Sequence, residues 1–336
     1  MRLVTYNVEW FDALFDDDGN LQENQEWSAR RNITRREQLD ALGLVFQRLD
    51  ADAIMIIEAP DTNRRRSTEK ALVNFADRYG LRATSAITGF PNTTQQEIAL
   101  LYDADKLRVR HDPQDSKAAP RFDTEFEIDL DIDARADRVA FSKPPLELAV
   151  ETMSGESLRI VGAHLKSKAP HGAKGREEVM RLAIANRRKQ LAQAVWLRRR
   201  IAAHLAAGED LVLMGDLNDG PGLDSYEGLF GRSSVEILLG DGDGAEMHLY
   251  DPHAAEALQR RLGAQPTTAR FFLYDEKRYL QALLDYVMIS PGLRARNPRW
   301  RIWHPFDDAE CWQDEALRAS LLVASDHFPV TLDIDL

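Results

Sequence analysis

Cysteine is the scarcest residue type in this 336-residue chain, which contains one, Cys311. A single thiol excludes an internal disulfide, a cysteine-based metal cluster and a dithiol redox pair. The sequence also lacks an apolar run long enough to span a bilayer. Its start, MRLVTYNVEW, has no basic segment followed by an apolar one, so no signal peptide is visible. We therefore expect a cytoplasmic protein without a membrane span.

Segments typical of interdomain linkers are missing as well. No Pro/Gly/Ser-rich stretch, low-complexity segment or internal repeat divides the sequence. The chain is 44% hydrophobic, which is ample for a large core, although its length alone would allow two domains. We predict one domain over residues 1–336, with loop insertions near 12–30, 112–137 and 225–275.

Positive charge is in deficit, with 43 Lys and Arg against 55 Asp and Glu and a net charge of -12. This balance argues against a general basic surface that grips nucleic acid. It leaves room for a local basic cleft, or for metal ions that supply positive charge. The insertion at 112–137 is itself strongly acidic and favours a small phosphorylated substrate over a nucleic acid.

Hydrophobic patterns predict strands that alternate with helices, and therefore an α/β (α+β) fold. Continuous apolar runs indicate buried strands, and apolar residues at helical spacing indicate amphipathic helices. In the longest expected helix, the basic cluster at 187–189 is assigned to a solvated face. Strands are expected at 3–6, 53–57, 97–102, 139–150, 157–161, 211–214, 283–289 and 331–334, and helices at 34–49, 69–79 and 176–206.

The most informative stretch is 211–221, LVLMGDLNDGP, in which an apolar strand ends at Gly215 and three polar residues follow. Residues two apart on an extended backbone point the same way, so Asp216 and Asn218 face one point. A carboxylate acceptor beside an amide donor suits a site that activates water next to a phosphoryl oxygen. The structural alternative is a strand followed by an Asx-rich turn.

Polar residues also follow two other predicted strands. Asn7 ends the first strand and is either a turn residue or a donor into the same cleft as Asp216. Glu58 comes directly after an apolar run, where a carboxylate is costly to bury without a partner. It is either exposed at the strand end or a ligand for a hard cation such as Mg²⁺.

Two histidines lie beside charged residues at further strand ends. His164 and Lys166 share a face and suit neutralisation of a phosphate, although a lone histidine at a strand end is most often structural. Asp285 lies inside a predicted strand and needs a partner. Asp326-His327 precedes the last strand and is either a simple turn or, with Asp285 bound to the imidazole, an oriented acid/base or phosphate-contacting histidine.

Six motifs follow one another in an order that resembles the endonuclease/exonuclease/phosphatase superfamily, the deoxyribonuclease I-like fold. The resemblance runs from residue 2 to the end of the chain. It implies a four-layer αββα sandwich of two mixed β-sheets flanked by helices, with one site at the sheet edges. It also implies hydrolysis of phosphoester bonds that depends on Mg²⁺ or Mn²⁺. The motifs are TYNVEW, IMIIEAPD, GAHLKSK, GDLNDGP, LLDYVMIS and SDHFPV.

The resemblance also implies a set of metal ligands. Glu58 would be the principal ligand, assisted by Asn7 and Asp326. The family usually has a glutamine before this glutamate, whereas this sequence has Ile57. That departure weakens the local support of Glu58 without removing the ligand.

Proton transfer and phosphate binding are implied for the remaining motif residues. Asp216 would position or deprotonate the attacking water, and Asn218 would hold the water or the phosphate. His327, oriented by Asp285, would contact the phosphate. His164 would be the second histidine of the nuclease-like members, acting as a general acid or charge stabiliser.

Two positions bear on the branch of the family. Nuclease-like members have an additional acid that orients the first histidine, and either Gln96 or Glu97 falls near that place. Inositol-phosphate phosphatases often have a basic residue after the aspartate of LLDYVMIS, and Tyr286 stands there instead. The motif set most resembles the bacterial nuclease-like members.

The leading hypothesis is therefore a nuclease that cleaves DNA or RNA, with Asn7, Lys166, Asn218 and His327 on the phosphate. Lys166 and Lys168 beside the site favour this substrate. One alternative is a phosphatase or phosphodiesterase acting on a small phosphorylated metabolite or lipid headgroup. Another is a non-catalytic binding module. The sequence leaves the oligomeric state open.

Overall fold

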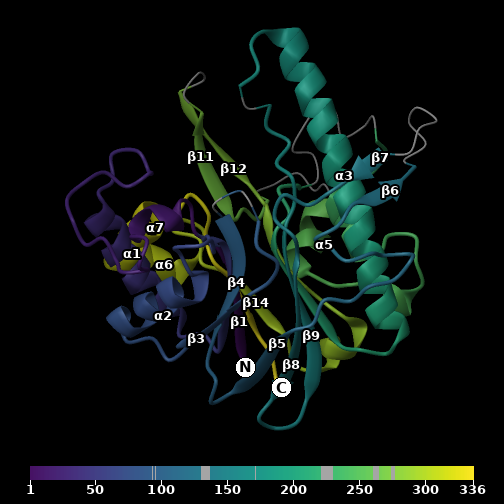
Figure 1. Ribbon diagram of the computed structural model, residues 1–336, viewed down its shortest axis with the longest axis horizontal. Helices are drawn as coiled ribbons and strands as arrows, with labels where there is room; N and C mark the ends of the chain where they lie inside the picture. The colour runs from purple at the N-terminus through teal and green to yellow at the C-terminus, as the bar shows by residue number, and fades with distance from the viewer. Residues whose placement is uncertain are drawn as a thin grey trace.

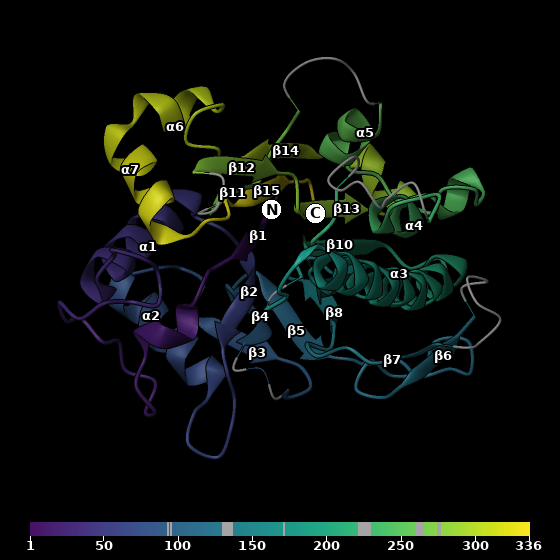
Figure 2. The same ribbon diagram turned by 90° about the horizontal axis from the view of Figure 1, so that it is seen from above.

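Two stacked β-sheets form the centre of the computed structural model, with helices on both outer surfaces (Figures 1 and 2). The structure describes residues 1–336 except 93, 95, 130–136, 171, 221–229, 260–264 and 274–276. One hydrophobic core lies between the two sheets. A second lies between the first sheet and its helices, and a third lies between the second sheet and its helices. The predicted four-layer sandwich is confirmed.

The first sheet has the strand order β14-β15-β1-β2-β4-β3. At its centre β1 runs parallel to β2, so the carboxyl ends of these two strands lie at the same edge. Strands β4 and β15 run antiparallel to them, and their amino ends therefore reach that edge too. The strands are β1 (Arg2–Asn7), β2 (Ala53–Pro60), β3 (Ser85–Thr88), β4 (Gln96–Tyr102), β14 (Arg299–Ile302) and β15 (Val330–Asp333).

The second sheet repeats this plan with the order β13-β10-β9-β8-β5. Its central pair, β9 and β10, is parallel, and β13 runs antiparallel to β10. Both sheets thus present two parallel carboxyl ends and the start of an antiparallel neighbour. The strands are β5 (Leu107–His111), β8 (Leu146–Thr152), β9 (Ser157–His164), β10 (Leu211–Asp216) and β13 (Asp285–Ile289).

The helices bury their apolar faces on the outer surfaces of the sheets. Helices α1, α2 and α7 contribute to the core outside the first sheet, and α3, α4 and α5 to the core outside the second. Thr34 caps α1 with Glu37 in a reciprocal capping box, which explains why the helix starts there. The helices are α1 (Arg35–Leu49), α2 (Thr68–Tyr79), α3 (Arg176–Ala206), α4 (Ser234–Leu239), α5 (Pro252–Leu258), α6 (Ala309–Gln313) and α7 (Glu315–Ala324), with 3-10 turns η1 (Phe11–Leu14), η3 (Ala245–Met247) and η4 (Pro291–Ala295).

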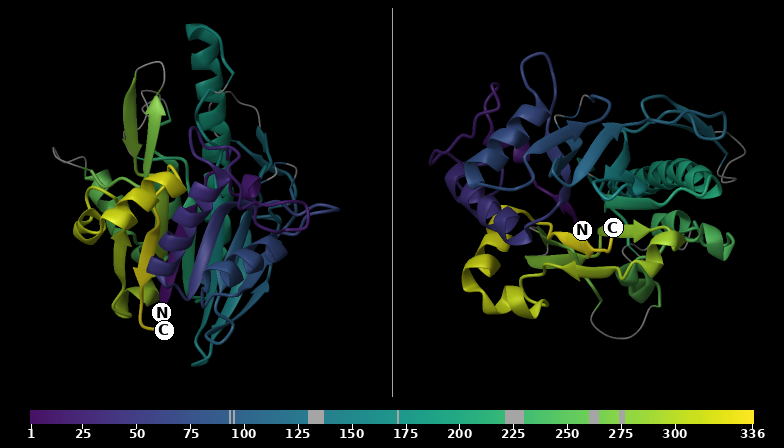
Figure 3. Two further views of the ribbon diagram at one scale, coloured as in Figure 1. Left: turned by 90° about the vertical axis from the view of Figure 1, so that its left-hand side faces the viewer. Right: turned by 90° about the horizontal axis from the view of Figure 1, so that it is seen from below.

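Two features project beyond the sheets at the edge where the parallel strands end (Figures 1 and 3). One is a hairpin of β11 (Ala269–Leu273) and β12 (Arg278–Ala282), and the other is the beginning of α3. In the acidic insertion, β6 (Phe126–Ile128) pairs with β7 (Asp137–Val139). No helix in the described ranges is long and apolar enough to cross a membrane.

Several predicted elements differ from those observed. The strand expected at 139–150 is wrong, because β7 ends at Val139 and β8 begins only at Leu146. The short elements β14, α6 and α7 were not predicted. Helical spacing would put Met180 on the apolar side of α3, yet it is exposed, since the first turns of this helix extend past the sheet (Figure 1). Arg187 was assigned to a solvated face, yet it is buried against Asp219.

Candidate active site

The polar residues at the strand ends meet because they share the inner face of the sandwich. Side chains alternate along a strand, so Asp216 continues the inward face of Val212 and Met214 in β10. In the sheet register, Asp216 lies opposite His164 on one side and Asp285 on the other. The three residues form a row across the second sheet.

The first sheet supplies the facing wall of a cleft of about 750 Å³. Asn7 ends β1 on the inward face, and His327 precedes β15. The projecting hairpin and α3 extend the walls of the cleft outward (Figures 1 and 3). Its lining includes Lys168 and eight of the nine predicted site residues, all except Asp285, namely Asn7, Glu58, His164, Lys166, Asp216, Asn218, Asp326 and His327.

Asp216 is held by two amides. The side-chain amides of Asn7 and Asn218 donate to its Oδ2 at 3.0 and 3.1 Å, and the backbone N–H of Asn218 donates to Oδ1 at 2.7 Å. A Cβ on Gly215 would lie 2.0 Å from the Ala163 carbonyl oxygen, so glycine is required just before the aspartate. Burial raises the pKa of Asp216 to about 7.

His327 and Asp285 form a buried pair, with His327 Nδ1 2.7 Å from Asp285 Oδ2. The hydroxyl of Thr268 donates to the same carboxylate oxygen at 2.8 Å and fixes its position. Burial opposes a charge on the imidazole, but the Asp285 and Asp216 carboxylates outweigh it and hold the pKa of His327 well above its usual value. His327 is therefore a cation at neutral pH.

His164 has the opposite character. Burial, reinforced by the cationic Lys143 and His327, holds the pKa of His164 well below its usual value, so this imidazole is neutral. Its Nδ1 lies 3.1 Å from Lys143 Nζ, and its Nε2 lies 3.5 Å from Asp216 Oδ2. Because an ammonium group only donates, Nδ1 accepts and Nε2 carries the proton.

Neither residue proposed to orient His164 does so in the described part of the chain. The Gln96 amide donates to Glu58 Oε2 at 2.6 Å, and the Glu97 carboxylate accepts from Asn92 Nδ2 at 2.7 Å. The partner of His164 Nδ1 is instead Lys143, which sequence reasoning missed. Its signal was the block AFSKPPLEL, which places a basic residue just before the strand beside β9.

Three acidic residues, Glu9, Glu58 and Asp326, line the cleft on the side of the first sheet, opposite His164 and Asp216; we call them the acidic group. Glu58 lies at a bulge in β2, where its φ is +64° and the pairing with β4 shifts register between Ile57 and Ala59. Glu9, two residues after Asn7, joins this group and was also missed. Burial and the nearby Asp326 raise the pKa of Glu9 to about 7. The spacing of two from Asn7 was the available signal.

Two sets of residues could hold a metal ion. Ligand atoms of Asp216, Asp285 and His327 lie within 4.8 Å of one another, but the proton on His327 would repel a cation. The second set is the acidic group of Glu9, Glu58 and Asp326 with Asn7, which all line the cleft; among the described residues, Asn7 Oδ1 is buried without a hydrogen-bond partner. Burial also raises the pKa of Glu58. These oxygen donors fit a hard divalent cation.

Asp219, the third polar residue of GDLNDGP, has a structural role. Asp219 is completely buried, forms an ion pair with Lys168, and lies 3.5 Å from Arg187 of α3. Its other carboxylate oxygen accepts the backbone N–H of Ser234 at 2.8 Å, just as α4 begins. Asp219 thus fixes the loop that carries the cleft lysines against two helices.

We expect Asp219→Asn to lower the free energy of unfolding by about 3–5 kcal/mol, because removing one member of a buried ion pair leaves a charge poorly compensated. Urea unfolding followed by circular dichroism measures this change. Asp243→Asn is the matched control, since the Asp243 carboxylate pairs with Arg198 but is half exposed. It should cost less than about 1 kcal/mol. Equal losses in the two variants would contradict the structural role of Asp219.

The family model described as Endonuclease/Exonuclease/phosphatase family matches residues 4–327. The chain belongs to this family. Its motifs account for the residues that the two sheets bring together, and the resemblance inferred from the sequence is confirmed. No curated protein sequence matches the chain.

Solved structures of other family members share the fold at low sequence identity. An AP endonuclease from Archaeoglobus fulgidus matches with a TM-score of 0.51 and 13% identity, covering 100% of both chains. TDP2 from Caenorhabditis elegans matches with a TM-score of 0.51 and 13% identity, covering 100% of this chain and 75% of that one. A family protein from Bacteroides thetaiotaomicron gives 0.50 and 13%, covering 99% and 93%. At this identity the likeness shows the fold.

Proposed function

We propose that this protein is a divalent-metal-dependent nuclease that cleaves phosphodiester bonds of DNA or RNA by attack of water. The observation that carries the proposal is one cleft in which the first sheet supplies an acidic group and His327, and the second sheet supplies Asp216 and His164, with the two histidines of opposite character. Phosphoester hydrolysis needs a proton acceptor, charge stabilisation and a leaving-group contact, and this cleft offers a separate group for each.

Asp216 is the proposed proton acceptor. Its pKa of about 7 suits a general base near neutral pH, and the two amides that hold it leave its carboxylate aimed into the cleft. Asn218 would hold the water through its Oδ1, because its Nδ2 already donates to Asp216 Oδ2 and to the Leu165 carbonyl; contact with a phosphate oxygen would need one of these two bonds to open. The Asn7 amide N–H donates to Asp216. Its Oδ1, which has no partner among the described residues, could join the acidic group as a metal ligand.

The two histidines have different proposed roles, namely charge stabilisation and contact with the leaving group. Cationic His327, held by Asp285, is placed to contact the phosphate and to stabilise charge that develops on its oxygens. Neutral His164 presents its Nε2–H to the cleft, where it can donate to the departing oxygen. Lys166 also lines the cleft and suits a phosphate contact.

Glu58 and Asp326, with Asn7 and Glu9, would hold Mg²⁺ or Mn²⁺. When bound, such an ion polarises a phosphoryl oxygen and lowers the pKa of water. Burial raises the pKa of Glu9 and of Glu58, although Arg30 forms an ion pair with Glu9 and Lys143 lies 3.8 Å from Glu58. A cation at this position would relieve the mutual repulsion of these carboxylates.

A second candidate is a phosphatase or phosphodiesterase for a small phosphorylated metabolite or lipid headgroup. The net charge of -12 and the acidic insertion favour it, because both oppose a long polyanion. We also propose that the protein is cytoplasmic and consists of one domain.

The deciding experiment is hydrolysis of a substrate panel by the purified protein with Mg²⁺ or Mn²⁺. The panel contains plasmid DNA, single-stranded DNA, RNA, bis-p-nitrophenyl phosphate and p-nitrophenyl phosphate. We expect cleavage of the polymers, abolished by EDTA and restored by excess Mg²⁺ or Mn²⁺. The Asp216→Ala variant, which metal should not rescue, controls for contaminating nuclease. Turnover of small esters alone would overturn the nuclease proposal in favour of the second candidate.

A further inference from the structure

Aromatic rings and guanidinium groups alternate along a surface that runs from β12 to α7. The Arg270 guanidinium lies 3.3 Å from the ring centre of Tyr279 and 5.3 Å from that of Phe306. The Phe306 ring lies 6.3 Å from the Trp312 ring, and the Arg318 guanidinium lies 4.6 Å from Trp312. We call these five residues the aromatic–arginine ladder.

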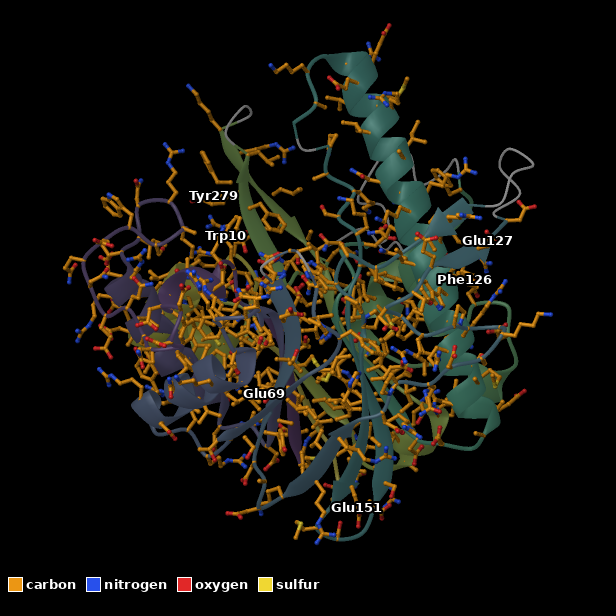
Figure 4. All side chains as sticks on the ribbon, viewed as in Figure 1. Trp10, Glu69, Phe126, Glu127, Glu151 and Tyr279 are labelled. Atoms are coloured by element: carbon orange, nitrogen blue, oxygen red, sulfur yellow. The ribbon has the colours of Figure 1, made fainter. Side chains whose placement is uncertain are left out.

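The rings of the ladder face solvent. Tyr279, Phe306 and Trp312 are 49%, 38% and 51% exposed. Exposed aromatic rings that gather on one surface mark binding sites more often than single exposed ones do. Figure 4 shows Tyr279 at the end of the molecule from which the hairpin projects.

The arginines of the ladder have no carboxylate at ion-pair distance among the described residues. The Nε atom of Arg270 is buried and has no hydrogen-bond partner there. Two acids in the segment between these arginines have other partners, since Asp307 contacts His304 and Glu310 pairs with Arg301. In an acidic chain whose arginines are commonly ion-paired, this surface keeps two positive charges available to an anion.

The ladder begins next to the cleft. Phe271 lines the cleft, with its ring 5.5 Å from that of His327. Arg270 is the preceding residue of β11, so its side chain points to the opposite face of the hairpin. Its backbone N–H donates to the Asp326 carbonyl at 2.8 Å. Figure 2 shows α6 and α7, the helices that contain Trp312 and Arg318, beside this hairpin.

We propose that the ladder binds unpaired nucleotides of a nucleic acid whose cleaved phosphate lies in the cleft. This inference rests on the nuclease proposal and names a preferred substrate class, namely polymers with a single-stranded segment. Surfaces that bind single strands combine positive charge with aromatic side chains on which bases stack. An acidic peptide would satisfy the arginines but would leave the exposed ring faces without a stacking partner.

The test is binding of a fluorescein-labelled oligothymidine of about 15 nucleotides, which is within reach of one binding platform. Fluorescence anisotropy is measured with the full-length protein in EDTA, so that no cleavage occurs. We expect Phe306→Ala combined with Trp312→Ala to weaken binding about tenfold or more, and Arg270→Gln to weaken it less. Binding of a blunt duplex of the same length should change little.

Trp27→Ala is the matched control, because Trp27 is 67% exposed but does not belong to the ladder. It should bind oligothymidine like the unmodified protein.

Hydrolysis of bis-p-nitrophenyl phosphate by the double variant verifies that the cleft is intact. If polymers are cleaved but the double variant binds oligothymidine normally, the ladder proposal fails and the nuclease proposal stands. If oligothymidine binds through the ladder but no polymer is cleaved, the nuclease proposal fails alone. Equal competition by polyglutamate would overturn base stacking in favour of an acidic peptide.

Discussion

Replacing Asp216 by asparagine should lower kcat for phosphodiester hydrolysis by about 10²–10⁴-fold, the usual contribution of a general base. Asparagine has nearly the same size, and its one carbonyl oxygen can keep the contacts with the Asn7 and Asn218 side-chain amides while the contact with the Asn218 backbone N–H is lost. What is lost is a carboxylate that takes up a proton near neutral pH. The free energy of unfolding should change little or rise, because a buried charge is removed.

The measurement is steady-state hydrolysis of a polymer and of bis-p-nitrophenyl phosphate at saturating Mg²⁺. Asp219→Asn provides the comparison, since Asp219 is also buried and lies three residues away but belongs to an ion-pair cluster. That variant should lose stability and less than about tenfold in kcat. If Asp216→Asn retained most of its kcat, Asp216 would not be the proton acceptor.

His327→Ala is the second substitution with a large expected effect, a loss of about 10²–10³-fold in kcat. This is the size observed when one donor to a developing oxyanion is removed. The loss should exceed any change in KM if the imidazolium acts mainly on the transition state. Phe271→Leu is the control, because this ring contacts His327 but carries no charge.

Asp285→Asn tests how the charge of His327 is maintained. Burial alone would lower the pKa of His327, and the Asp285 carboxylate is the largest influence that raises it. A cation with a raised pKa is lost only as pH rises through that value. Removing the carboxylate lowers the pKa, so the alkaline limb of the kcat/KM profile should move to lower pH. An unchanged alkaline limb would show that Asp285 does not set this charge.

The sequence could predict those features that depend on local periodicity. The bounds of α3 agree with the expected helix at 176–206, because apolar spacing and the stop at Gly208 are both local signals. Asp216 and Asn218 do meet, but through the predicted alternative of an Asx turn and not through an extended chain, because β10 ends at Asp216, Asn218 has a φ of +50°, and its backbone N–H donates to Asp216 Oδ1. Short elements such as β14 could not be predicted, since four residues of mixed polarity show no clear hydrophobic periodicity.

The motifs determined in part which polar residues form the candidate site, and the tertiary structure determined the rest. Sequence alone determined that polar residues follow apolar strands, and the family resemblance ordered them into one site. Only the register of β10 between β9 and β13 decided that Asp216 lies opposite both His164 and Asp285. Register depends on how distant strands pack, and no local pattern encodes it.

The same limit explains the residues that sequence reasoning missed or misplaced. Lys143 contacts His164 across 21 positions, and Arg187 is buried because Asp219 reaches it across 32. Side-chain charge is visible in the sequence, whereas burial and the identity of the partner are not. Because those two quantities set the pKa of each group, the neutral state of His164 and the cationic state of His327 were decided only by the folded chain.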